Sequence, residues 1–196
     1  MTRSLPTLAG VALLAVSTCA RADTWQIDPM HTLAQFSVRH MGISTVRGAF
    51  TKVSGSVQYD PADPSKTVID VTIDAASVDT HVSMRDNDLR GSNYFDVAKY
   101  PTLTFKSRRV EPAGNGKLKV TGDLTIHGVT KEVTLDVDGP SEPMKDPRGN
   151  MHMGASATTT ISRKEFGVTG GAMMVGDEIP ITIDVEMMKP APTPSH

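Results

Sequence analysis

Apolar and polar residues alternate with a period of two through most of this chain. The clearest run lies near the C-terminus, where Ile181, Ile183 and Val185 are separated by Thr182 and Asp184. The same alternation occurs in further runs at residues 34–39, 69–74, 103–106, 118–127 and 132–137. Because successive side chains of a strand point to opposite faces, each run predicts a strand with one buried and one solvent-facing side.

Two less regular segments complete the set of predicted strands. Residues 46–59 contain Gly48 and Gly55, which suggest a bulge or a sharp bend. Residues 153–161 place small or apolar residues at alternate positions, namely Met153, Ala155, Ala157, Thr159 and Ile161. About eight strands joined by Gly-, Asn- and Pro-containing turns predict one all-β domain. Closure into an antiparallel up-and-down barrel, lipocalin-like in form, is favoured because it leaves no exposed edge.

One segment, residues 80–100, lacks the alternation. Ser83 and Asp86 fit a capping box, and Gly91 suits the position after a helix, so a short helix is predicted over 84–90. Three apolar residues of this segment are expected to pack onto one end of the barrel: Leu89, Tyr94 and Phe95.

The expected interior of the barrel is rich in small residues and poor in aromatic ones. The chain has five Phe, three Tyr and one Trp, and the inward positions include Ala34, Gly48, Gly122, Ala155, Ala157 and Thr159. An eight-stranded barrel is either filled by its own side chains or holds one small ligand. These residues are consistent with a dry, hollow lumen, and equally with small residues fitted to the taper of a filled barrel.

A hollow lumen would suit a long apolar ligand. Nine inward residues are predicted to line such a tunnel: Phe36, Val38, Phe50, Val71, Ile73, Phe105, Leu124, Ile126 and Ile183. Each buried methylene contributes about 0.8 kcal/mol, whereas ordering and association cost an estimated 4 kcal/mol or more. About fifteen buried carbons would therefore leave useful affinity without any polar contact.

Residues 1–22 read as a secretory signal peptide. Arg3 precedes a short apolar stretch, and Ala20-Arg21-Ala22 is a small-x-small cleavage site, so the mature domain is expected to begin at Asp23. Cys19 allows a lipoprotein alternative, although the residues before it fit that signal poorly. The barrel domain is expected over residues 23–188, followed by a Pro-rich tail at 189–196.

Composition narrows the classes of function. The formal net charge is −2 and no basic run is present, which argues against a nucleic-acid partner. The one cysteine falls within the predicted signal, so neither disulfides nor thiol chemistry is expected. After the signal, no apolar stretch approaches the ~20 residues of a transmembrane helix, so an integral membrane protein is not expected. No cofactor motif and no nucleophile motif are found.

Polar residues near the predicted helix could form a site at the barrel mouth. Arg85 and Asp86, with His40, are the candidates. The simpler interpretation is a salt-bridged network that pins the helix to the barrel. His40 could also lie near His31, but a metal site would need a third ligand, so structural roles are favoured and no metal is expected.

Methionines offer two further possibilities. The segment Met151-His152-Met153 has residue types that bind Cu(I), although Met153 also fits the inward positions of its strand, which favours packing. Met173 and Met174, in a Gly-rich loop, could form an adaptable lid over the lumen or simply pack within the loop.

Taken together, the residues resemble a known family. The order and spacing of ten blocks are similar to those of the YceI-like, polyisoprenoid-binding, lipocalin-like proteins: Trp25–His31, Phe36–His40, Gly48–Phe50, Asp79-Thr80, Arg85–Arg90, Tyr94–Val97, Tyr100-Pro101, Gly122–Lys131, Arg163–Gly167 and Val175–Ile179. The resemblance implies an extended antiparallel barrel, a periplasmic or secreted location, a long isoprenoid-like chain in the lumen and often a homodimer. Ala49, Asp88 and Asn93 depart from the residues usual in the family, so no head-group contact is carried over from them.

The resulting expectation is a non-enzymatic, exported protein that holds an isoprenoid-type or similar amphiphilic chain for transport, storage or sequestration. The alternatives are an enzyme acting on a bound lipid or quinone near Arg85, Asp86 and His40, and a stress-related metal-handling protein that uses residues 151–153.

Overall fold

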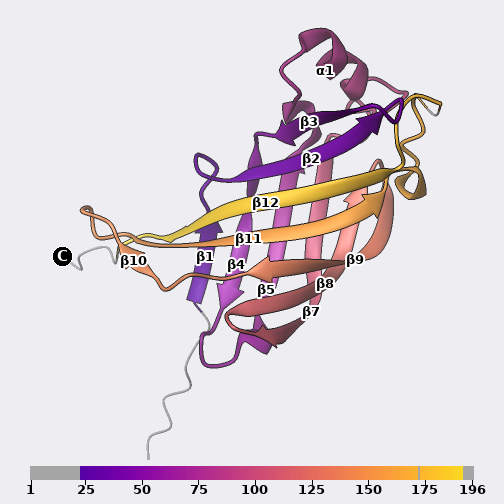
Figure 1. Cartoon of the computed structure of the whole chain (residues 1–196). Coiled ribbons are helices and arrows are strands. Elements are labelled where there is room, and N and C mark those ends of the chain that lie inside the picture. Colours follow the sequence, from indigo (N-terminus) through magenta and orange to yellow (C-terminus); the bar gives the residue numbers. More distant parts are fainter. Residues whose placement is uncertain (1–22, 172, 192–196) are drawn as a thin grey trace, which may run out of the picture.

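The computed structural model describes residues 23–171 and 173–191. The predicted signal peptide and the last residues of the predicted tail lie outside the described residues. Within them the protein is a curved antiparallel sheet with one α-helix, α1 (Ser83–Arg90), at one end (Figure 1). The strands are β1 (Asp23–Ile27), β2 (Leu33–His40), β3 (Ser44–Phe50), β4 (Val53–Tyr59), β5 (Val68–Asp74), β6 (Val78–Asp79), β7 (Thr102–Gly114), β8 (Lys117–Ile126), β9 (Val129–Asp138), β10 (Met144–Lys145), β11 (Met151–Ser162) and β12 (Glu178–Lys189).

Eight of these strands close into a barrel, which confirms the predicted fold. The order is β11-β9-β8-β7-β5-β4-β1-β12, and β11 pairs with β12 from Met151↔Lys189 to Ser162↔Glu178 to complete the circle. Every pairing is antiparallel, so the strands follow one another in an up-and-down meander.

The remaining strands are largely continuations of barrel strands past a break. β1 and β2 lie along the same edge of β12: β1 pairs with Met187 and Met188, and β2 pairs with residues 181–184. In the same way β3 leads into β4, and β5 leads through a 3₁₀ turn, Ala75–Ser77, into β6. The β2–β3 hairpin therefore extends the barrel wall toward α1, as Figure 1 shows.

The helix begins differently from the prediction. Ser83 is the first residue of α1, the residue before it is Val82, and no side chain caps the helix. Asp86 does not complete a capping box, because its carboxylate accepts hydrogen bonds from Thr80 instead. The expected packing is confirmed: Leu89, Tyr94 and Phe95 contact the main hydrophobic core.

Gly48 and Gly55 mark close approaches between neighbouring strands rather than a bulge. The registers of β3 with β2 and of β4 with β5 are unbroken, and the irregularities lie between β7 and β8. A Cβ on Gly48 would lie 2.6 Å from the ring of Phe36, and one on Gly55 would lie 2.1 Å from the carbonyl oxygen of Asp70. The bend predicted in this segment falls at residues 51–52, between β3 and β4.

Candidate ligand-binding site

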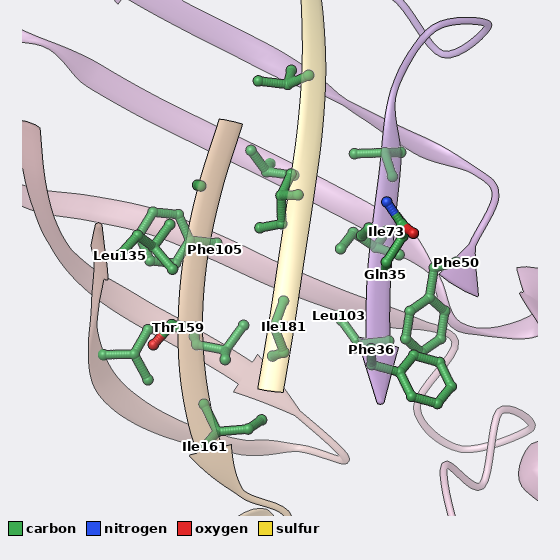
Figure 2. Close-up of a pocket in the computed structure, with 18 of the residues that line it drawn as sticks. Gln35, Phe36, Phe50, Ile73, Leu103, Phe105, Leu135, Thr159, Ile161 and Ile181 are labelled. Atoms are coloured by element: carbon green, nitrogen blue, oxygen red, sulfur yellow. The ribbon is translucent and has the colours of Figure 1, made fainter. Parts of the chain in front are cut away.

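The interior of the barrel contains a cavity of about 260 Å³. Its wall takes side chains from all eight barrel strands and from the segment around α1, and the exposed surface of that wall is almost wholly apolar. Figure 2 shows part of this wall, where Phe36, Phe50, Ile73 and Leu103 surround one region and Thr159, Ile161 and Ile181 another. The lumen is therefore hollow and apolar.

The cavity is long and narrow. Along β12 alone, alternate residues from Ile179 to Met187 line it. Eight residue steps at about 3.3 Å each give a lined length of about 26 Å along this strand. Because the volume is small for such a length, the space suits an extended chain better than a compact ring system.

The structure places all nine predicted tunnel residues in the cavity wall: Phe36, Val38, Phe50, Val71, Ile73, Phe105, Leu124, Ile126 and Ile183. The small residues Ala34, Ala155, Ala157 and Thr159 line it as well. Sequence reasoning missed lining residues outside the regular strands, among them Phe166, Val168 and Val175, because they carry no period-two signal.

One charged side chain, Arg163, reaches the cavity wall, and its guanidinium is held by main-chain carbonyl groups. It is 6% exposed, and it donates to the carbonyl oxygens of four residues: Val168, Gly170, Val175 and Gly176. These bonds fasten the loop before β12 to the end of β11. The guanidinium thus has a structural role, with four of its five N–H donors bonded to the main chain.

A smaller pocket of about 110 Å³ adjoins the cavity beside α1. Both spaces share apolar walls, formed by Phe36, Val38, Leu89, Tyr94 and Val175. The smaller pocket adds polar residues that the main cavity lacks, namely His40, Thr80, Arg85 and Asp88. An amphiphile could therefore place its chain in the lumen and a polar end here.

Two of the three predicted mouth residues, His40 and Arg85, line this smaller pocket, and Asp86 does not. Asp86 is 6% exposed, and its Oδ1 accepts the Thr80 N–H at 2.8 Å and the Thr80 hydroxyl at 2.5 Å. These hydrogen bonds hold the pKa of Asp86 below its ordinary value. Asp86 therefore orients Thr80, which lines the smaller pocket.

The predicted salt-bridged network is instead a set of hydrogen bonds to Thr80 and the main chain. Arg85 donates to the hydroxyl and the carbonyl oxygen of Thr80, both at 2.8 Å. Arg90 donates to the carbonyl oxygens of Ala76 and Val78, both at 2.8 Å. These bonds pin α1 to the β5–β6 segment, as expected of the network, but the partners are carbonyls and a hydroxyl rather than carboxylates.

The remaining candidates do not gather at the cavity. His31 and His40 flank opposite ends of β2, so the expectation that they lie together is wrong. Met153 is 3% exposed and lines the cavity, whereas His152 points to the outer face, so residues 151–153 do not converge on one copper ion.

Neither Met173 nor Met174 lines the cavity or the smaller pocket. Met173 is 99% exposed, and from this loop Val175 reaches both spaces. The structure therefore places the two methionines outside the position that a lid would need.

Comparison with known proteins agrees with this architecture. A family model described as the YceI-like domain matches residues 25–187. A UPF0312 protein of Vibrio cholerae is 35% identical over 172 residues, which are 86% of this chain and 89% of that protein.

Solved structures share the fold. BcnA of Burkholderia cenocepacia has a TM-score of 0.72 and 29% identity, covering 82% of this chain and 98% of that one. A polyisoprenoid binding domain from Saccharophagus degradans has a TM-score of 0.64 at 16% identity, covering 85% and 98%, a likeness that shows the fold alone. From the domain match and the identity to its relatives, the chain belongs to the YceI-like family.

Proposed function

We propose that this protein binds one long apolar chain of isoprenoid type inside its barrel and carries or sequesters it without chemical change. The observation that carries this proposal is the apolar cavity, lined continuously from strand to strand. Water hydrates such an apolar wall poorly. An apolar chain is therefore the ligand whose transfer from water into the cavity is most favourable in free energy.

The binding free energy is expected to depend more on the length of the apolar chain than on its head group. Each methylene removed from water contributes about 0.8 kcal/mol, so the binding free energy grows with each carbon that enters. The polar groups beside α1 offer a place for a hydroxyl, phosphate or quinone oxygen, through Arg85 and His40. Because this polar pocket can accept head groups of several kinds, we expect the protein to discriminate weakly between them.

Binding rather than catalysis fits the wall of the cavity. Among the described residues that line it, the charged group is Arg163, four of whose five N–H donors are taken by carbonyl oxygens. Among the described residues, the lumen wall has no carboxylate and no imidazole that could act as acid or base on the buried part of the chain. His40, Arg85 and Asp88 lie at the pocket beside α1, which supports polar recognition of a chain end.

The relatives support the same class of ligand. The Saccharophagus degradans domain of the same fold is described as polyisoprenoid binding. We extend the proposal to location: residues 1–22 act as a secretory signal, and the protein works in the periplasm or outside the cell. In the described part of the chain, no helix has the length and apolarity needed to cross a membrane.

Titration with isoprenoid alcohols of increasing length tests the proposal. For delipidated protein, geraniol, farnesol and geranylgeraniol should bind with affinities that rise at least tenfold for each added isoprene unit, until the lumen is full. Changing the hydroxyl of farnesol to an amine or a carboxylate should alter affinity by less than one isoprene unit does. Calorimetry measures both, and affinities that follow the head group and ignore chain length would refute the proposal.

A further inference from the structure

A cluster of metal-ligating side chains lies outside the barrel, where the β1–β2 loop crosses β12. Asp28 and His31 belong to the loop, and Glu186 lies on β12 with its side chain opposite in direction to the inward Val185 and Met187. One ligand atom from each of the three lies within 4.8 Å of the others. Two oxygens and one nitrogen from three positions thus converge on one point.

The main chain holds the loop against β12 at this place. The Asp28 N–H donates to the Glu186 carbonyl oxygen at 2.9 Å, and the Glu186 N–H donates to the Thr32 hydroxyl at 3.2 Å. Asp28 is nearly buried, with its Oδ1 accepting the Met30 N–H at 2.8 Å and its Oδ2 lying 2.8 Å from His31 Nδ1. The three groups are therefore brought together by backbone structure rather than by chance contact of long side chains.

Glu186 is further oriented by a second histidine. His152 Nδ1 lies 2.8 Å from Glu186 Oε1, and His152 Nε2 lies 3.3 Å from Asp146 Oδ2. Asp146 in turn accepts from the side chain of Asn150 at 2.9 Å. The contact with His152 fixes the orientation of the Glu186 carboxylate. Metal-binding carboxylates are commonly held in this way by outer hydrogen bonds.

We infer that Asp28, His31 and Glu186 bind a divalent transition-metal cation, with Zn²⁺ as the best match, and that His152 positions Glu186. Two carboxylate oxygens and one imidazole suit Zn²⁺, Co²⁺ or Mn²⁺ better than Ca²⁺ or Mg²⁺, which prefer oxygen alone. Zinc bonds of about 2.0–2.2 Å hold neighbouring ligand atoms roughly 3–3.5 Å apart, so small side-chain rotations suffice. His31 is 61% exposed at its side chain, which leaves the ion an entry path and open positions for water.

This inference does not rest on the proposed lipid function, because the cluster faces away from the lumen. Its test is calorimetric titration of untagged, chelator-treated protein with zinc chloride. One equivalent should bind saturably, and His31→Ala and Glu186→Gln should each weaken binding at least tenfold. His81→Ala is the matched control, since His81 and Asp79 form an exposed pair at 3.5 Å and belong to no three-ligand cluster within the described residues; it should leave the affinity unchanged.

The role of His152 has its own readout. His152→Ala should weaken zinc binding about 10–100-fold at unchanged stoichiometry, and His152→Asn, whose amide can replace Nδ1 toward Glu186, should restore part of the loss. Circular dichroism confirms that each variant is folded. Absence of saturable binding, or zinc binding that persists unchanged in both His31→Ala and Glu186→Gln, would overturn the inference.

Discussion

Replacement of Ala157 by tryptophan is expected to weaken the binding of a long apolar ligand on the order of 50-fold. Ala157 lies at the middle of β11, opposite Ile183 on β12 and Val137 on β9, and all three line the cavity. An indole at this position would occupy the narrow lumen. Displacing about three methylenes of the ligand costs roughly 2.4 kcal/mol, or on the order of 50-fold in affinity. Calorimetric titration with farnesol measures the loss.

The neighbouring residue supplies the control. Thr158 lies on the same strand, is exposed and points to the outer face, so Thr158→Trp adds the same side chain outside the barrel. Its affinity for farnesol should match that of the unmodified protein. Because the indole of Ala157→Trp enters existing space, that variant should remain folded. Equal farnesol binding by the two variants would mean that the ligand does not occupy the lumen.

The variant Gly55→Ala should be among the most destabilising substitutions in the protein. Gly55 has φ +145°, and a Cβ there would lie 2.1 Å from the carbonyl oxygen of Asp70 on β5. That oxygen belongs to the main chain of a paired strand, so it cannot move without disturbing the β4–β5 register. Backbone strain and the clash together should cost about 3 kcal/mol or more, which lowers Tm by roughly 6–12 °C. Thermal unfolding followed by circular dichroism measures the shift.

Gly154→Ala is the matched substitution for this measurement. Gly154 also lies within a barrel strand, β11, but a Cβ there would lie 3.5 Å from the carbonyl oxygen of Val185, an ordinary contact. We expect its Tm to stay within about 2 °C of the unmodified protein. Equal effects at Gly55 and Gly154 would contradict the account of the β4–β5 approach.

The barrel and its lining could be predicted because period-two alternation reports directly which side chains face inward. In β11, the alternate positions from Met153 to Ile161 all line the cavity. The sequence did not decide whether the lumen is hollow or filled, since Ala155 and Ala157 could equally have been packed against large side chains. Strand β1 was not predicted, because its five residues, Asp23–Ile27, offer only two buried positions, Trp25 and Ile27, too few for a period-two signal.

Features that depend on contacts between distant residues were not accessible from the sequence. Glu186 meets Asp28 and His31 only because β12 runs beside the β1–β2 loop, so the third ligand missing from the local sequence lies at the far end of the chain. Asp86 looked like part of a capping box, yet Thr80 takes its carboxylate. In both cases a local motif has a partner that the tertiary structure supplies.

The central claim, that the barrel holds one apolar chain, is tested most directly by native mass spectrometry of the protein purified without detergent, followed by organic extraction. The account predicts an added mass corresponding to a single extractable isoprenoid-type or similar long-chain molecule per protein, and a lower occupancy in Ala157→Trp. A protein that carries no such molecule and takes up none when delipidated and offered farnesol would contradict the claim.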